Sequence, residues 1–165
     1  MNAIDIVFIL DESDSVSWAE FALMRLFLSR FVSALDIDSG HTRVGLATYA
    51  SFVGQSINLN NHSSRASLQS AISSLRYLGG STNTAAALGY VRTQMLTSAA
   101  GDRSNVPDVI ILLTDGQSDD RRATQVCRVV WTRAFRFVEK KIRFDSVRFT
   151  LTNRFFDSIR FDSTI

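Results

Sequence analysis

Two short apolar runs, each leading into an aspartate, constrain the fold of this chain more than any other feature. The first extends from Ile4 to Leu10 and is followed by Asp11, and the second extends from Asp108 to Thr114 and is followed by Asp115. Apart from Asp5, the first run is apolar at successive positions rather than at alternate ones. This pattern is typical of strands that are buried on both faces, as in parallel sheets covered by helices.

Helical patterns alternate with these strands. Apolar residues recur at spacings of three and four from Ser17 to Leu35, and Ser17 with Glu20 forms a capping-box pattern at the start. The remaining predicted elements are two strands, Arg43–Tyr49 and Phe52–Ile57, and two helices, Ser64–Leu78 and Thr84–Ser98. The alternation predicts an α/β fold in which a doubly wound, mostly parallel sheet is flanked by helices.

Oxygen-bearing side chains follow the predicted strands at one end of the sheet. Asp11, Ser13 and Ser15 stand at every second position after the first strand, Thr82 lies in a Gly-Gly turn, and Asp115 follows the last strand. The first motif alone would also suit a strand end followed by a helix cap. However, loops converge beyond the carboxyl ends of parallel strands, and oxygen ligands suit hard cations. The sequence therefore predicts a site for Mg²⁺ or Mn²⁺.

At these residues the chain resembles the von Willebrand factor A domain (vWA domain). The metal-ion-dependent adhesion site of that family consists of a D-x-S-x-S motif, a threonine and an aspartate, and the matching residues here are Asp11, Ser13, Ser15, Thr82 and Asp115. The resemblance implies that the three hydroxyls bind Mg²⁺ directly. It implies that the two aspartates hold the ion directly or through water. An open position would then accept a Glu or Asp carboxylate from a protein ligand.

The resemblance covers about residues 4 to 120, and it is closest to matrix members of the collagen-like and matrilin-like kind. The stretches that carry it beyond the ligands are Thr42–Tyr49 and Leu75–Gly80. It implies a non-enzymatic adhesion module that binds a protein, such as a matrix protein, within a longer secreted chain. Two alternatives are an intracellular, cytoplasmic vWA scaffold domain in a multiprotein complex and a truncated product without function.

An enzymatic alternative is a Mg²⁺-dependent phosphatase of the haloacid-dehalogenase type, which also begins with an aspartate after its first strand. That chemistry requires a second aspartate where this chain has Ser13, and a lysine for the phosphate. The only lysines of the sequence are Lys140 and Lys141. The sequence also contains no P-loop and no G-x-G-x-x-G motif. We therefore expect a protein that is not an enzyme.

Residues 121–165 differ in composition from residues 1–120. The first 120 residues contain 7 Arg and no Lys against 12 acidic residues, whereas the last 45 contain 11 Lys and Arg against 4 acidic residues. Seven of the 12 Phe lie between residues 135 and 161, among short repeats of an Arg-Phe-Asp-Ser theme. We interpret this segment as a low-complexity tail rather than as a basic arm that binds nucleic acid or a membrane surface. We expect no nucleic-acid partner.

The expected organisation is an incomplete vWA-like domain over residues 1–120 and an atypical basic, Phe- and Arg-rich tail over residues 121–165. The C-terminal strand and helix of the family would be missing or replaced. Within the tail, the sequence suggests a helix over Arg121–Lys141 and a makeshift strand over Ile142–Leu151.

Few features bear on the cellular compartment. No apolar run approaches the roughly 20 residues of a membrane-spanning helix, and no signal peptide is visible. Because of the family resemblance, we expect the chain to be part of a longer extracellular protein. Asn61-His62-Ser63 is an acceptor sequence for N-glycosylation, which matters only in a secreted chain. Cys127 is the single cysteine and excludes an internal disulfide.

Overall fold

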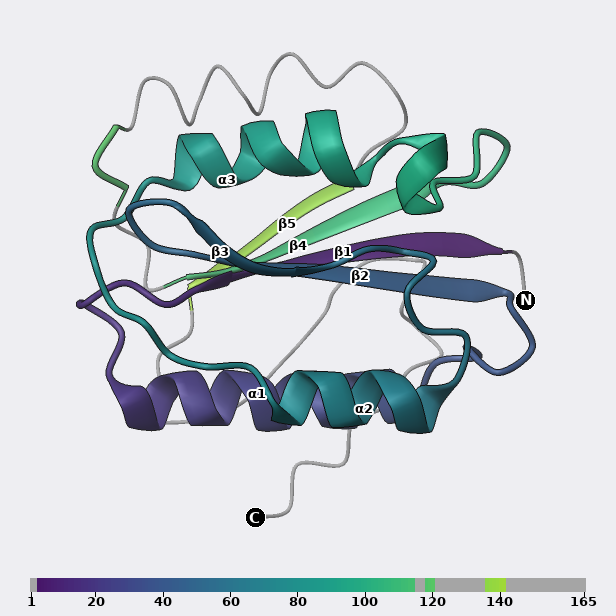
Figure 1. Cartoon of the computed structure of the whole chain (residues 1–165), viewed down its shortest axis with the longest axis horizontal. Helices are drawn as coiled ribbons and strands as arrows, with labels where there is room; N and C mark the ends of the chain where they lie inside the picture. The colour runs from purple at the N-terminus through teal and green to yellow at the C-terminus, as the bar shows by residue number, and fades with distance from the viewer. Residues whose placement is uncertain (1–2, 115–117, 121–135, 142–165) are drawn as a thin grey trace.

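A sheet lies between two layers of helices in the computed structural model (Figure 1). The structure describes residues 3–114 and 118–120, and the backbone of residues 136–141. Helices α1 (Trp18–Ser33) and α2 (Arg65–Ser73) cover one face of the sheet, and α3 (Thr84–Tyr90) covers the other (Figure 1). Within the described residues, no helix is long and apolar enough to cross a membrane.

The described strands form one sheet with the order β3-β2-β1-β4-β5. The central strand β1 (Ile4–Asp11) pairs in parallel with β2 (Thr42–Tyr49) on one side and with β4 (Asp108–Thr114) on the other. At the edges, β3 (Val53–Ile57) runs antiparallel to β2, and β5 (Arg136–Lys141) runs parallel to β4. The predicted α/β fold with a mostly parallel sheet is confirmed.

The central strand is buried on both faces because helices cover both sides of it. Ile6, Phe8 and Leu10 pack into a core with α1 and α2, where the largest buried partners are Phe21, Met24, Leu28 and Phe31. Val7 and Ile9 point to the opposite face and pack against α3 and the segment that follows it, through Ala87, Leu88, Val91 and Met95. The continuous apolar run of β1 is therefore accounted for by two cores that share one strand.

Hydrogen bonds at the start of helix α1 fix the residue at which the helix begins. The Ser17 hydroxyl accepts a hydrogen bond from the Glu20 amide at 3.2 Å, and the Glu20 carboxylate accepts one from the Ser17 amide at 2.7 Å. The predicted capping box is therefore confirmed. It matters for the candidate site because α1 begins three residues after Ser15, so the capping box fixes the end of the loop that carries the predicted ligands.

Two predicted helices have different ends in the structure. The helix predicted over Ser64–Leu78 ends at Ser73, where the hydroxyls of Ser73 and Ser74 donate to the carbonyls of Gln69 and Ala71. Such local bonds compete with helix continuation. The helix predicted over Thr84–Ser98 is α-helical to Tyr90 and continues as a π-helical segment, Val91–Met95, and a 3₁₀ turn, Ser98–Ala100.

The position beside β4 is occupied by β5, formed by Arg136–Lys141. The prediction of a helix over Arg121–Lys141 is therefore wrong for its last six residues. Pairing with the edge of β4 outweighs their partial helical pattern. The fifth strand thus comes earlier in the sequence than the predicted makeshift strand. Residues 121–135 and the predicted strand Ile142–Leu151 lie outside the described residues.

A buried ion pair connects β1 to the loop before β4. The Asp5 side chain is fully buried, and its carboxylate accepts hydrogen bonds from the Arg103 guanidinium, with the shortest N–O distance at 2.6 Å. Arg103 also donates to the backbone carbonyls of Ile4, Gly40 and His41. The one charged residue in the apolar run of β1 therefore serves to join three segments at the amino-terminal ends of the strands.

We predict that Arg103→Met lowers the free energy of unfolding by about 3 kcal/mol, because it leaves the Asp5 carboxylate buried without its counter-ion. Urea denaturation followed by circular dichroism measures this change. The matched control is Arg65→Met, which removes a partly exposed arginine paired with the exposed Asp38 at 3.5 Å and should cost less than about 1 kcal/mol. Equal losses in the two variants would contradict the role assigned to the buried pair.

Candidate metal centre

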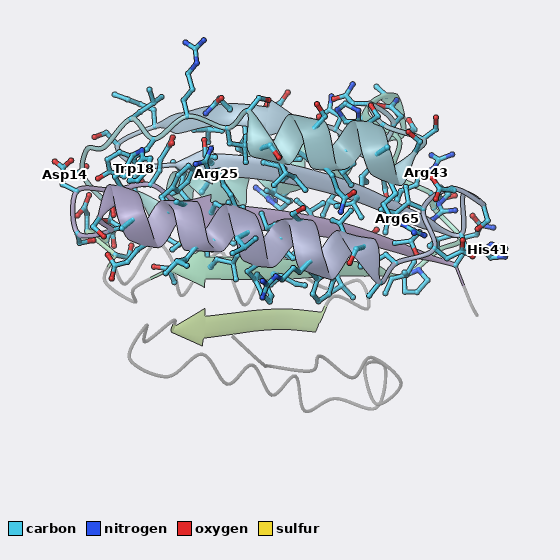
Figure 2. The ribbon with its side chains drawn as sticks, turned by 90° about the horizontal axis from the view of Figure 1, so that it is seen from below. Asp14, Trp18, Arg25, His41, Arg43 and Arg65 are labelled. Carbon is cyan, nitrogen blue, oxygen red and sulfur yellow. The ribbon has the colours of Figure 1, made fainter. Side chains whose placement is uncertain are left out.

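The predicted ligand residues come from loops that meet at the carboxyl ends of the parallel strands. The sheet register pairs Asp11, the last residue of β1, with Tyr49 of β2, and pairs the preceding Leu10 with Leu113 of β4. The loop after β1 therefore emerges between the ends of two neighbouring strands. Figure 2 shows Asp14, within this loop, and Trp18 at one end of the molecule, with His41, Arg43 and Arg65 at the other.

Hydrogen bonds hold the Asp11 carboxylate in one orientation. Its Oδ1 accepts from the amide and the hydroxyl of Ser13, at 3.0 and 2.6 Å. Its Oδ2 accepts from the hydroxyls of Thr114, at 2.7 Å, and Tyr49, at 3.2 Å. Asp11 and Ser13 are both fully buried. The carboxylate thus joins β1, β2, β4 and the first loop at a single point.

Burial and the nearby Asp11 charge raise the pKa of Tyr49 far above its usual value. The phenol therefore keeps its proton and serves as a hydrogen-bond donor at any physiological pH. It contacts the Thr84 hydroxyl at 3.2 Å as well as Asp11. Tyr49 is not among the site residues predicted from the sequence. Its position at the end of β2, paired with Asp11 at the end of β1, is the feature that could have identified it.

The hydroxyls of Ser13 and Ser15 lie 3.1 Å apart. Adjacent ligands of an octahedral Mg²⁺, each about 2.0–2.1 Å from the ion, are about 2.9 Å apart. The observed spacing therefore fits two neighbouring positions on one cation. Ser13 directs its hydrogen to Asp11, which leaves oxygen lone pairs of that hydroxyl for a metal. Ser15 is exposed, so an ion would have access to the pair.

The loop that carries Thr82 is attached to the first loop by its backbone. Gly80 donates its amide to the Asp14 carboxylate at 2.8 Å, and its carbonyl accepts from the Asp14 amide at 2.8 Å. Gly79 and Gly80 have φ angles of 77° and 122°, and a Cβ on Gly79 would collide with the Asp14 carboxylate. This turn therefore requires glycine. Asp14 is exposed, but it tethers one loop to the other.

Asp119 fixes the backbone of Thr82 through two hydrogen bonds. Its carboxylate accepts a hydrogen bond from the Thr82 amide at 2.8 Å, and its own amide donates to the Thr82 carbonyl at 3.0 Å. In the sequence, Asp119 is one of two adjacent acidic residues and belongs to no recognisable motif. No short-range pattern indicates this pairing across 37 positions. The structure therefore brings Asp11, Ser13, Ser15 and the Thr82 loop together, whereas Asp115 lies outside the described residues.

Glu12 is buried, although a charged residue in a loop is usually solvated. Its side chain is 1% exposed, and its Oε2 has no hydrogen-bond partner among the described residues. Burial and, to a smaller extent, the Asp11 charge raise the pKa of Glu12, while hydrogen bonds from Thr48 and the Leu78 backbone oppose the shift. The carboxyl group thus lies between the end of β2 and the loop that precedes Thr82.

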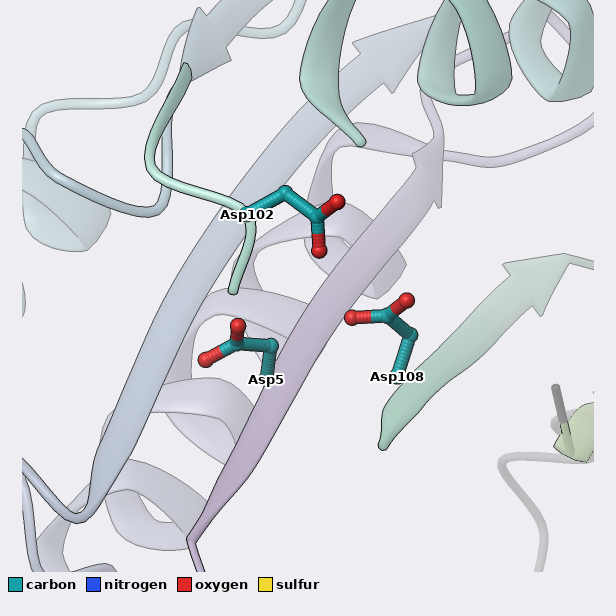
Figure 3. Close-up of side chains that lie close together, drawn as sticks. All are labelled: Asp5, Asp102 and Asp108. Atoms are coloured by element: carbon teal, nitrogen blue, oxygen red, sulfur yellow. The ribbon is translucent and has the colours of Figure 1, made fainter. Parts of the chain in front are cut away.

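A second group of carboxylates lies at the opposite end of the sheet. Asp5, Asp102 and Asp108 bring carboxylate oxygens within 4.8 Å of one another (Figure 3). The Asp5 carboxylate already accepts from Arg103 Nε at 3.0 Å and from its terminal nitrogen at 2.6 Å. A cation at this group would therefore have to compete with a guanidinium, which makes it a poorer metal site than the hydroxyl-rich loops.

We predict that Glu12→Gln stabilises the metal-free chain at neutral pH. A carboxyl group whose pKa is raised in the folded state binds more protons folded than unfolded, so its contribution to stability falls as pH rises above the ordinary value of 4.5. The difference in unfolding free energy, variant minus wild type, should therefore grow between pH 4.5 and pH 8. Chemical denaturation in EDTA at several pH values measures it. A difference that is constant with pH would contradict the raised pKa.

Comparison with known proteins supports the relationship suggested by these motifs. The family model of the von Willebrand factor type A domain matches residues 5–137. Bovine matrilin-1 is 40% identical over 119 residues, which cover 70% of this chain and 22% of matrilin-1. The mouse collagen alpha-4(VI) chain is 36% identical over 118 residues, which cover 70% of this chain and 5% of the collagen chain. The chain thus spans a small part of these relatives.

Solved structures agree with the fold. Proximal thread matrix protein 1 from the mussel byssus matches with a TM-score of 0.77 at 18% identity, covering 84% of this chain and 37% of that protein. A second structure of the same protein, described as having a zinc-occupied MIDAS motif, matches with a TM-score of 0.69 at 24% identity, covering 84% of this chain and 35% of that protein. The family match extends beyond the predicted limit of residue 120 and includes the start of β5. The chain belongs to the von Willebrand factor type A domain family.

Proposed function

We propose that this chain is a non-enzymatic protein-binding module that uses a divalent cation to bridge to a carboxylate of its ligand. The observation that carries the proposal is the pair of Ser13 and Ser15 hydroxyls, 3.1 Å apart beside a fixed Asp11 carboxylate. Family membership adds support, because the von Willebrand factor type A domain model matches residues 5–137. The relatives are matrilin and collagen chains, which supports a module of an extracellular matrix protein.

In this proposal Ser13, Ser15 and Thr82 provide hydroxyl ligands. Asp11 and Asp115 hold the ion directly or through water. An ion held mainly by neutral hydroxyls stays electron-poor and supplies a strong attraction for an anionic ligand. The oxygen-only set favours Mg²⁺ or Mn²⁺, and the zinc-occupied motif of the mussel protein supports occupancy of such a motif by a divalent cation.

Exposed apolar side chains near the site support a protein ligand rather than a small free anion. Trp18 is 66% exposed and lies three residues after Ser15, and Leu78 is 65% exposed and precedes the Gly79-Gly80 turn. Phe52 is 82% exposed in the turn whose Ser51 hydroxyl accepts from the Ser81 amide. Large apolar side chains around a polar centre are typical of protein interfaces. The proposed ligand segment therefore carries an acidic residue flanked by apolar ones.

We predict that Ser15→Ala weakens Mn²⁺ binding about tenfold or more, the scale seen even for groups that only orient metal ligands. Isothermal titration of the full chain with Mn²⁺ measures the dissociation constant. Ser70→Ala is the matched control, because Ser70 is also exposed but lies on α2. It should bind Mn²⁺ as the wild type does. A Ser15→Ala variant with unchanged affinity would remove the basis of the proposed site.

We predict that the chain binds acidic segments of matrix proteins on a peptide array in Mg²⁺ and that EDTA abolishes this binding. Replacing the acidic residue of a bound peptide by its amide should abolish binding too. Phe52→Ser should weaken binding about tenfold, as for an exposed aromatic that contacts the partner, without changing Mn²⁺ affinity. Leu23→Ser, at an exposed position of α1, is the control and should leave binding intact. Binding that persists in EDTA would contradict the bridging role of the cation.

A further inference from the structure

We propose that Asn61 is an N-glycosylation site and that its glycan lies at the end of the domain opposite the candidate metal centre. The sequence contains one acceptor triplet of the N-x-S/T type, Asn61-His62-Ser63. The proposal depends on the extracellular location advanced above, but it does not depend on metal binding. Glycosylation and metal binding can therefore be tested separately.

The triplet has the exposure that modification requires. Asn61 and Ser63 are both exposed, in the irregular segment between β3 and α2. The Asn61 side chain uses its Oδ1 to accept from the Asn58 amide at 2.6 Å. Sugars are attached to the other atom of that amide, Nδ2, so this turn can persist after modification. The His62 ring is directed to the Ser67 hydroxyl of α2, at 2.6 Å, rather than over the asparagine.

Neighbouring contacts locate the triplet at the far end of the sheet. Asn60 donates to the Ala99 carbonyl at 3.0 Å, and the backbone of Asn60 lies against Gly101. The carbonyl of Gly101 accepts a hydrogen bond from the Arg43 side chain. The Arg65 amide, four residues after Asn61, donates to the Asp38 carboxylate. Arg43 and Arg65 lie at the opposite end of the molecule from Asp14 (Figure 2). A glycan on Asn61 therefore leaves the loops of the metal centre open.

The chemistry of the modification is a group transfer from a lipid-diphosphate-linked oligosaccharide. Asn61 Nδ2 forms a bond to C1 of the reducing-end sugar, and the bond between C1 and the diphosphate oxygen breaks. The diphosphate leaves with the lipid, Nδ2 loses one proton, and no redox change occurs. The Ser63 hydroxyl is the part of the triplet that the transferase recognises together with the asparagine. The structure leaves both groups at the surface.

Expression of the full chain in animal cells behind a cleavable secretion signal tests the proposal. Site mapping by mass spectrometry, on cell lysate and on medium, should find glycan on Asn61 that peptide N-glycosidase removes. Asn61→Gln and Ser63→Ala should each abolish it, whereas Ser63→Thr and Asn60→Gln should retain it. An unoccupied Asn61 in both fractions, or a glycan that survives in Asn61→Gln, would overturn the assignment.

A second readout tests the location of the glycan. The glycosylated wild type and the unglycosylated Asn61→Gln variant should bind Mn²⁺ with the same dissociation constant, because the modified residue lies far from the metal loops. A glycan that weakens Mn²⁺ binding severalfold would contradict its placement at the opposite end. If neither form binds Mn²⁺ but Asn61 carries glycan, the proposed function fails and the modification site stands.

Discussion

The fixed Asp11 carboxylate is the interaction on which the arrangement of the candidate site depends. It lies at the end of the central strand and accepts hydrogen bonds from Ser13, Tyr49 and Thr114. These donors come from the loop after β1 and from the strands on either side of it. Because a buried carboxylate needs such donors to offset its loss of hydration, the position of the first loop is tied to the sheet itself.

The second loop is attached to the first, rather than to the sheet alone. Asp14 pairs with Gly80, and Asp119 pairs with Thr82, in each case through two hydrogen bonds. The two variable positions of the D-x-S-x-S motif thus have structural roles. Asp14 tethers the Thr82 loop, and Glu12 is buried with hydrogen bonds from Thr48 and the Leu78 backbone. A metal ion would bind to loops that the chain already holds together, which lowers the entropic cost of assembling its ligands.

Much of this architecture could be predicted from the sequence, for physical reasons. The strands β1 and β4 are continuous apolar runs, and Ser17 with Glu20 marks the start of α1 through local bonds alone. Features that depend on distant partners were not predictable. Glu12 and Asp119 look like surface acids in the sequence, and only the folded chain buries one and pairs the other with Thr82. Strand β5 forms because β4 offers an edge, which no local pattern in Arg136–Lys141 indicates.

A crystal structure of the full chain with Mn²⁺, in which anomalous scattering locates the ion, tests the candidate metal centre directly. If the hydroxyl-rich loops hold the ion, a single strong peak should lie within about 2.3 Å of the Ser13 and Ser15 hydroxyl oxygens, with Thr82 as a third neighbour, given the usual lengths of such metal–oxygen bonds. A peak at the Asp5, Asp102 and Asp108 carboxylates, with none at the serine pair, would contradict this assignment. In that case the hydroxyl-rich loops would not be the metal centre of this domain.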